Sequence, residues 1–401
     1  MTRPRLSMTA EELMARSRAM AGVDLVDEHV IEPLTLMVYS LNEEAEIDAE
    51  GARAYERKFL RLLTNRLWMK RDFLAHPEIA ELPVNGPVIV MGVARSGTTK
   101  LQKVLAASGD FNFLTFWQNF CWASQTGVPG EPLEARIAEA DDFCNWFDVR
   151  SPETKLGHHF LALEPEEEGP LSEGCFVTPS LIGYSEVPTY ARWFAGQSRL
   201  VFFEFLRDVC KYLQWQGLAD PAKPWLLKSP NYKGQELEIL KVFPDTRFVI
   251  AHRSPLQTLP SMCKLVQCFR KAYGGTAPPN QAIVERNYMT MESHLAIRAA
   301  HPELPLIDVR FEDIVDALPQ VIDRIYAHAG MELTAEARGR MIRWNTENQM
   351  HKLGEFKYSL EDAGLDPAVI RQRMAGYFEL LDGLSPLSTQ PAWGEPQRQA
   401  D

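Results

Sequence analysis

Residues 88–107 run from a short apolar segment through a glycine-containing loop into a helical pattern, and this order constrains the fold more than any other part of the chain. The segment VIVM (88–91) is rich in β-branched residues, as strands buried on both faces of a sheet are. The loop GVARSGTT (92–99) follows at once, and Leu101, Val104 and Leu105 then have helical spacing. In such a unit the loop amides and the helix N-terminus point toward one anion. The sequence therefore predicts an anion-binding loop at 92–99, with a ligand-free glycine turn as the alternative.

The loop differs from the one that binds nucleoside triphosphates in P-loop enzymes. That loop reads G-x-x-x-x-G-K-[ST], and its lysine binds the β- and γ-phosphates. Thr98 stands at the lysine position here, and Lys100 comes two residues later, inside the predicted helix. The sequence thus disfavours a P-loop nucleotide-dependent kinase or hydrolase, which remains the main alternative function.

Three further apolar runs resemble the first, and each precedes a helical pattern. They are WLLK (225–228), TRFVIAHR (246–253) and LPLIDVR (304–310). Strands that alternate with helices predict βαβ units and a parallel sheet. Residues 9–75 have helical patterns instead, beginning at Thr9, a predicted N-cap that Glu11 and Glu12 follow. We expect an α/β fold, a P-loop-like three-layer α/β/α arrangement around a central parallel sheet, preceded by an α-helical N-terminal extension.

The same patterns predict how the chain is organised. The HPEIAELPVNGP segment before the first strand is a Pro/Gly boundary, and more than a hundred mostly helical residues separate the first two strands, too many for a simple crossover. We expect an α-helical extension at 1–84, one main domain at 85–385 with a helical acceptor-site insertion at 110–220, and a flexible tail at 386–401.

A basic residue follows or closes each of the four predicted strands: Arg95, Lys228, Arg253 and Arg310. Ligands of open parallel sheets bind at the carboxyl edge of the strands. The chain has 42 Lys and Arg against 54 Asp and Glu, a net charge of −12, so cations gathered at one edge indicate a polyanionic ligand. Lys228 and Arg253 are each followed by Ser-Pro, a pair suited to a helix start. The alternative is ordinary pairing with carboxylates, which we favour only for Arg310, beside Glu312.

Charge and cysteine content limit the partners and the compartment. A net charge of −12 disfavours nucleic acid and anionic lipid as partners. The six cysteines are irregularly spaced without a C-x-x-C pair, as in a protein with reduced thiols. The N-terminus lacks an uninterrupted apolar stretch, and no apolar run approaches the ~20 residues of a membrane span. We expect a cytoplasmic protein without integral membrane contact, and leave self-association into a homo-oligomer open.

Three blocks of the sequence resemble the sulfotransferases that use 3′-phosphoadenosine 5′-phosphosulfate (PAPS), particularly the bacterial branch similar to tyrosylprotein sulfotransferases. They are VIVMGVARSGTTKLQKVLAAS (88–108), WLLKSPNYKGQELEILKVFPDTRFVIAHRSPLQTLPSM (225–262) and VRFEDIV (309–315). With LEPEEEG (163–169) and HKLGEFKYSLEDAGL (351–365), the resemblance extends over most of residues 85–365.

The resemblance implies a role for several residues. Lys228 would be the catalytic cation beside the bridging oxygen, and Arg253 and Ser261 would bind the 3′-phosphate. The 5′-phosphosulfate would bind the loop residues Arg95, Ser96, Gly97, Thr98 and Thr99. Lys352, Lys357 and Tyr358 would cover the nucleotide, with an exposed loop as the alternative.

These roles agree with the chemistry of sulfuryl transfer. Like phosphoryl transfer, it needs in-line positioning and compensation of charge on the equatorial and leaving oxygens, which Arg95, Lys228 and the loop amides could provide. A sulfuryl group carries one fewer negative charge than a phosphoryl group, so we expect no metal. Aromatic residues in the insertion, most of them expected in the core, favour a small and largely apolar acceptor with a hydroxyl or phenol group.

The family's carboxylate base is missing from its usual position. Members carry it about twenty residues past the loop arginine, often as Thr-Trp-Glu, but this chain has Gln118 there, and an amide cannot take a proton. A non-catalytic nucleotide-binding protein therefore stays an alternative, as does an acceptor acidic enough to need no base. The substitutes lie in one segment, and we rank Glu167, the second Glu of the family's Pro-Glu-Glu, ahead of His159; the others are His158, Glu166 and Glu168.

Overall fold

The computed structural model describes residues 4–275, 280–348 and 354–387. The chain divides into two compact units that each combine distant parts of the sequence. The first unit, which we call the helical unit, comprises Met1–Val84, Leu114–Ala222 and Lys264–Pro279. The second, the sheet unit, comprises Asn85–Phe113, Lys223–Cys263 and Asn280–Asp401.

The sheet unit is built on four parallel strands in the order β2-β1-β3-β4. Their bounds are Val88–Gly92 for β1, Leu226–Lys228 for β2, Arg247–His252 for β3 and Leu306–Arg310 for β4. Ile89 pairs with Leu227 on one side and with Phe248 on the other. Every residue of β1 is buried, as expected of a central strand in a sheet covered on both faces. All four predicted strands, and with them the α/β fold, are confirmed.

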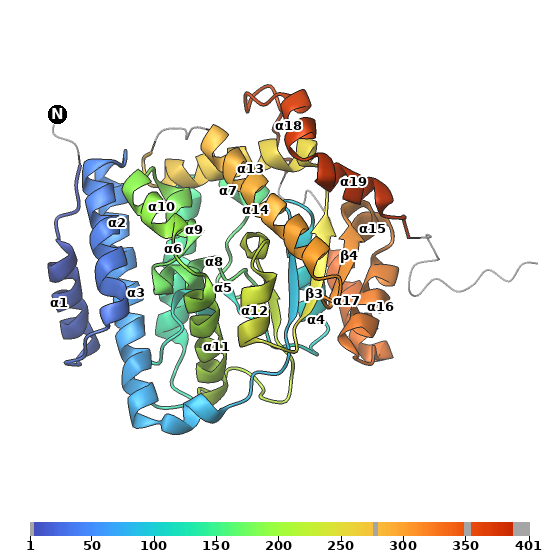
Figure 1. The fold of residues 1–401 in the computed structure, drawn as a ribbon. Coiled ribbons are helices and arrows are strands. Elements are labelled where there is room, and N and C mark those ends of the chain that lie inside the picture. Colours follow the sequence, from blue (N-terminus) through green and yellow to red (C-terminus); the bar gives the residue numbers. More distant parts are fainter. Residues whose placement is uncertain (1–3, 276–279, 349–353, 388–401) are drawn as a thin grey trace, which may run out of the picture. The chain divides into compact units, whose positions relative to one another are not determined.

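Helices cover both faces of this sheet (Figure 1). On one face Val90 and Val249 join a core that includes Leu105, Val321 and Met341. These come from α4 (Thr98–Ala107), α16 (Leu318–Ala329) and α17 (Ala335–Glu347). The other face carries polar anchors: β4 bonds to α14 (Asn280–Ala300), and β3 bonds to α19 (Ala375–Gly383). The three-layer arrangement agrees with the sequence prediction.

Shorter helices complete the sheet unit. They are η4 (Pro230–Tyr232), α12 (Glu236–Val242), the first part of α13 (Pro255–Ala272), α15 (Phe311–Asp316) and α18 (Pro367–Arg373). The helical pattern after β4 divides into α15 and α16 because Pro319 cannot continue a helix and instead occupies the first turn of the second one.

The helical unit contains the N-terminal helices and the predicted insertion. Its N-terminal elements are α1 (Ala10–Ala21), η1 (Glu28–Val30), α2 (Ile31–Glu43), α3 (Ala49–Ala75) and η2 (Pro77–Glu81). Thr9 and Glu12 form a reciprocal capping box at the start of α1, which confirms the predicted N-cap. The insertion adds α5 (Phe116–Phe120), α6 (Glu134–Arg150), α7 (Thr154–Gly157), α8 (Gly169–Ser172), η3 (Glu173–Cys175), α9 (Pro179–Tyr184), α10 (Pro188–Ala195) and α11 (Leu200–Trp215).

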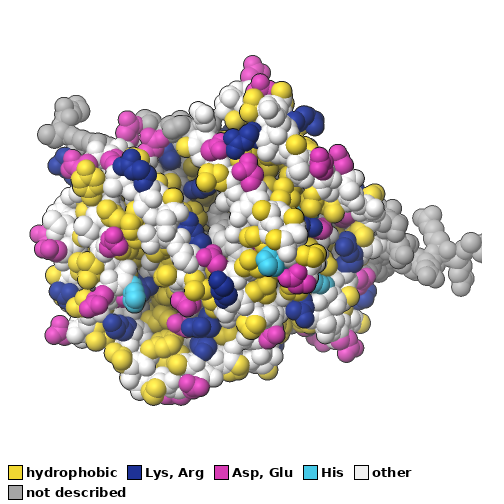
Figure 2. Space-filling view, in the orientation of Figure 1, with side chains coloured by type: hydrophobic (Ala, Val, Ile, Leu, Met, Phe, Trp, Pro, Cys, Tyr) yellow, Lys and Arg dark blue, Asp and Glu magenta, His cyan; other side chains and the backbone are white. Residues whose placement is uncertain are grey.

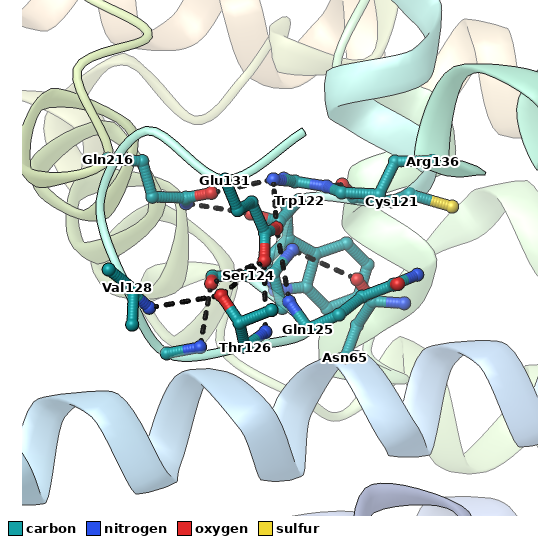
Figure 3. A network of polar contacts seen from close by, with 12 residues as sticks. Asn65, Cys121, Trp122, Ser124, Gln125, Thr126, Val128, Glu131, Arg136 and Gln216 are labelled. Atoms are coloured by element: carbon teal, nitrogen blue, oxygen red, sulfur yellow. Dashed lines mark hydrogen bonds and ion pairs between the residues drawn. The ribbon is translucent and has the colours of Figure 1, made fainter. Parts of the chain in front are cut away.

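In the helical unit, hydrogen bonds to the carboxylate of Glu131 hold the loop of residues 124–131 (Figure 3). Glu131 accepts hydrogen bonds from the Ser124 hydroxyl and from the backbone N–H groups of Gln125 and Thr126, at 2.9–3.1 Å. The buried Arg136 donates Nη1 to Glu131 at 3.0 Å and to Gln216 at 2.8 Å. Burial acts to raise the pKa of Glu131, but the hydrogen bonds from Ser124, Gln125 and Thr126 together lower it. The network orders residues 124–131 without regular secondary structure.

The surface shows how the net charge is distributed. On the face drawn in Figure 2, acidic and basic side chains are interspersed with each other and with apolar ones. Within the described part of the chain, no helix is both long and apolar enough to cross a membrane.

Candidate functional site

The predicted anion loop lies between β1 and α4 in the sheet unit. Gly92 ends the strand with φ 140°, and a Cβ built on it would lie 2.1 Å from the Ala251 carbonyl oxygen, so only glycine fits beside β3. Gly97 precedes α4 with φ 90° and gives the helix no side-chain cap. The N–H groups of the first turn are therefore not satisfied by a cap, which suits an anion.

Arg95 lies at the centre of this loop in an unusual conformation. Its φ is 72°, in the left-handed region that residues other than glycine seldom adopt and that is concentrated at functional sites. Ser96 beside it is fully buried and donates its hydroxyl to the Val93 carbonyl at 2.7 Å, which tightens the turn. Thr98 is buried and Thr99 half-buried at the start of α4.

The structure brings Arg95, Arg253 and Ser261 together. Arg95 donates Nε to the Ser261 hydroxyl on α13 at 3.2 Å. Arg253, just past β3, donates Nη1 to the Arg95 carbonyl oxygen at 2.9 Å. Two segments far apart in the sequence, one with Arg95 and one with Arg253 and Ser261, thus place two guanidinium groups and a hydroxyl at one edge of the sheet. The cluster offers guanidinium and hydroxyl N–H and O–H donors, which suit an anionic group.

Two phenylalanines and a glutamine that the sequence analysis did not single out complete the cluster. The guanidinium carbon of Arg253 lies 3.9 Å from the ring centre of Phe311, and that of Arg95 lies 5.8 Å from the ring centre of Phe356. Arg253 Nε also donates to Gln257 at 2.9 Å. Phe311 directly follows Arg310 at the end of β4, so its position at the sheet edge could have been predicted from the sequence. Phe356 lies in the segment that the sequence predicted to cover the nucleotide, but Phe356 itself was not singled out.

The other strand-end cations differ from each other. Lys228 ends β2 with only 1% of its surface exposed, and Ser229 after it caps η4 by accepting from the Asn231 N–H at 3.2 Å. Arg310 ends β4 and forms an ion pair with Glu312 at 3.5 Å. The ordinary pairing favoured for Arg310 is therefore confirmed.

The segment predicted to cover a nucleotide is described only in part. Lys352 lies outside the described residues. Lys357 is exposed and Tyr358 half-buried, and both directly follow the buried Phe356 that approaches Arg95. Residues 354–358 therefore lie at the anion loop within the sheet unit.

In the helical unit, Gln118 has a structural role. Its side-chain oxygen accepts from the Thr115 N–H at 2.9 Å and from the Thr115 hydroxyl at 3.0 Å, and its own N–H donates to that hydroxyl. This is the capping box of α5. Residues 162–166 lie alongside, because Trp117 donates its N–H to Ala162 and the Glu166 N–H donates to Leu114, both at 2.9 Å. The fold thus places the predicted substitutes next to the Gln118 segment.

Two histidine–carboxylate pairs lie in that segment. His158 Nε2 is 3.0 Å from Glu166 Oε2, and both side chains are largely buried, at 12% and 6% exposure. His159 Nε2 is 3.3 Å from Asp148 Oδ2, and both are about a quarter exposed. Glu167 is half-buried and donates its N–H to Glu166 at 2.8 Å, whereas Glu168 is buried. Neither pairing is apparent in the sequence, because Asp148 lies on α6 and Glu166 is eight residues away from His158.

Most of the insertion's aromatic residues belong to the interior of the helical unit. Phe116, Phe120 and Trp122 are buried, and so are Tyr184 and Tyr190. Phe116 stacks on Phe120 with ring centres 5.5 Å apart. The expectation that most are core residues is confirmed. Among the described residues, no group of three or more His, Cys, Asp or Glu side chains could hold a metal ion.

Comparison with known proteins gives one family and related folds. A model of the sulfotransferase family matches residues 87–335. The crystal structure of the sulfotransferase STF1 from Mycobacterium tuberculosis is 25% identical and has a TM-score of 0.73, with 92% of this chain and 99% of that chain covered. The sulfotransferase STF9 from Mycobacterium avium has the same fold at 22% identity, with a TM-score of 0.79 and 96% and 98% of the two chains covered. A search of curated proteins found no match.

Proposed function

The chain belongs to the sulfotransferase family, and on that premise we propose that it transfers the sulfuryl group of PAPS to the hydroxyl or phenol group of a small, largely apolar acceptor by in-line transfer. The observation that carries the choice of PAPS is the cluster of Arg95, Arg253 and Ser261 in the sheet unit, which offers two guanidinium groups and a hydroxyl to an anion. PAPS has two separate anionic groups, the 5′-phosphosulfate and the 3′-phosphate. A loop at a helix N-terminus and a neighbouring arginine–serine pair suit these two groups.

The proposed roles follow the chemistry of each side chain. The N–H groups of residues 95–99 and the Arg95 guanidinium would bind the 5′-phosphosulfate. Arg253 would bind the 3′-phosphate together with Ser261, whose hydroxyl accepts from Arg95 and can still donate to a phosphate oxygen. Lys228 would stabilise the negative charge that develops on the leaving oxygen. Lys352 and Lys357 would add positive charge over the nucleotide.

The proton of the acceptor requires a base, and we place it in residues 158–168. Glu167 and His159 remain the two candidates that rank first from the sequence. His158, also a candidate from the sequence, gains support from the structure, because a buried carboxylate 3.0 Å from one ring nitrogen can orient an imidazole and stabilise its protonated form. Gln118 is excluded, since its oxygen is used in the cap of α5 and an amide does not take a proton.

A panel of base variants tests this assignment. Glu167→Gln, His159→Asn and His158→Asn are compared across phenols of graded acidity, with Gln118→Glu as a gain-of-base variant. Loss of the true base should lower kcat roughly 10²- to 10⁴-fold for the least acidic phenol and less for more acidic ones, because a phenolate needs no base. If none of the three losses lowers kcat while Gln118→Glu raises it, the enzyme relies on acceptor acidity.

Two measurements test the function itself. We expect 3′-phosphoadenosine 5′-phosphate (PAP) at a hundredfold excess over its Kd to stabilise the protein by ~2.7 kcal/mol, equally with and without a chelator. PAPS incubated with a panel of phenols, alcohols and amines should give a sulfated product detectable by mass spectrometry. A melting shift with ATP and Mg²⁺ but not with PAP would favour the kinase alternative, and PAP binding without transfer to any acceptor would favour the non-catalytic one.

The remaining expectations stay predictions. All six cysteines are free and buried, which supports a cytoplasmic location. The acceptor is a small molecule in this proposal, and self-association stays open.

A further inference from the structure

Lys233 is a buried lysine beneath the anion loop that neither the family resemblance nor the proposed mechanism uses. It directly follows η4 in the sheet unit, and only 4% of its surface is exposed. Its ammonium donates to the Gly92 carbonyl oxygen at 3.0 Å and to the Pro230 carbonyl oxygen. Gly92 is the last residue of β1, and Pro230 follows β2 by two residues. The Lys233 side chain therefore connects the segment that leads to Arg95 with the segment that follows Lys228.

This bond lies where the sheet stops. The pairing of β1 with β2 ends at Val90 and Lys228, whereas β1 continues to Gly92. Beyond that register the backbone of β2 no longer holds the end of β1 on this side. The two carbonyl bonds of Lys233 supply the connection that the strand ladder lacks.

We propose that Lys233 is a positioning residue for the sulfuryl donor: it fixes the start of the anion loop to the segment after Lys228 and counters the negative ends of two backbone carbonyls near the bound anion. The proposal rests on the proposed function, because it takes the loop to bind PAPS. The physical basis is electrostatic. The partial negative charge of a carbonyl oxygen at a strand end repels a nearby anion, and an ammonium group hydrogen-bonded to that oxygen reduces the repulsion.

The electrostatic surroundings of Lys233 make its charge sensitive to pH. Burial lowers the pKa of the Lys233 ammonium to about 8. Glu236 on α12 acts to raise this pKa and Arg286 on α14 to lower it. Glu236 is itself bonded to His294 of α14 at 2.6 Å, in the fully buried interior. The ammonium is thus charged below pH 8 and loses its charge above it.

Three variants separate positioning from mere stability. Lys233→Met removes the charge and both bonds, and Lys233→Arg keeps a cation. Lys223→Met is the matched control, because Lys223 lies just before β2 and donates its ammonium to the Gly109 carbonyl oxygen at the same 3.0 Å, beyond the far end of α4. We expect PAP binding, measured by calorimetry at pH 7, to weaken roughly 10- to 100-fold in Lys233→Met, to recover to within a few fold of wild type in Lys233→Arg, and to stay within twofold in Lys223→Met.

A pH profile supplies a readout that a structural role would not change. Wild-type affinity for PAP should fall between pH 7 and pH 9.5, because deprotonation above about 8 removes a charge that favours the anion, whereas Lys233→Arg should show no such fall. If Lys233→Met does not fold, this comparison decides alone. Equal PAP affinity of wild type and Lys233→Met, or parallel pH profiles of wild type and Lys233→Arg, would overturn the positioning role alone. A wild-type chain that does not bind PAP would overturn the proposed function as well.

Discussion

Replacement of Arg253 by alanine should reveal which phosphate this side chain binds. Arg253 uses Nη1 for the Arg95 carbonyl and Nε for Gln257, and it stacks on Phe311. These contacts hold the guanidinium in one orientation before a ligand arrives. Within the described part of the chain, its side chain forms these two hydrogen bonds, so its other N–H groups can form charge-assisted bonds to a phosphate.

The expected magnitude follows from these bonds. A hydrogen bond to a charged group contributes about 1.5–3 kcal/mol, and Arg253 is only half-buried, so loss of two such bonds should cost about 2–4 kcal/mol. That corresponds to a roughly 30- to 1,000-fold weaker Kd for PAP. AMP lacks only the 3′-phosphate, so its affinity should change less than about threefold.

Calorimetric titration of wild type and Arg253→Ala with PAP and with AMP gives four binding free energies that form a closed cycle. The loss of PAP binding energy minus the loss of AMP binding energy gives the interaction of Arg253 with the 3′-phosphate. Arg310→Ala is the matched control at the neighbouring strand end, because Arg310 is paired with Glu312. Equal losses for PAP and AMP would refute the assignment and show that Arg253 acts only through the loop carbonyl it supports.

Three further results are expected. Arg95→Ala and Lys228→Ala should each lower kcat more than they raise the KM for PAPS, because their proposed targets gain charge during transfer; steady-state kinetics in which only KM changes would contradict this. Asp308→Asn should cost about 2–4 kcal/mol of stability at pH 7, since Asp308 is bonded to Arg298 at 2.6 and 2.9 Å and to His252 at 2.7 Å. These partners hold the pKa of Asp308 below its usual value, so the wild-type advantage in denaturant titrations should persist above pH 5 and shrink as the pH falls toward that lowered pKa. Burial raises the pKa of all six thiols, so a thiol reagent at pH 8 should label none of them in the folded protein and all of them in denaturant; rapid labelling of the native chain would contradict this.

The sheet was predictable because local patterns determine it. Each strand is a short run rich in apolar residues, and β1, which is buried throughout, has the unbroken apolar sequence VIVMG. The grouping of the helices was not predictable in the same way. Residues 1–84 and 114–222 belong to one compact unit, yet no local spacing records which helix packs against which. Such pairings depend on side chains that meet only after the chain has folded.

The same distinction separates the residues of the candidate site that could be predicted from the sequence from the one that could not. Arg95 and Arg253 could be singled out because the end of a strand is a local feature, and parallel strands bring their ends to one edge. Lys233 could not be singled out, because its proposed role depends on a hydrogen bond to Gly92 at the end of a different strand, and a lysine two residues after Ser-Pro-Asn is typical of a surface residue. Its burial with a lowered pKa is apparent only in three dimensions. A loop that lacks the lysine at position 98 thus has a buried lysine bonded to the carbonyl oxygen of its first residue, and this lysine comes from the segment after η4.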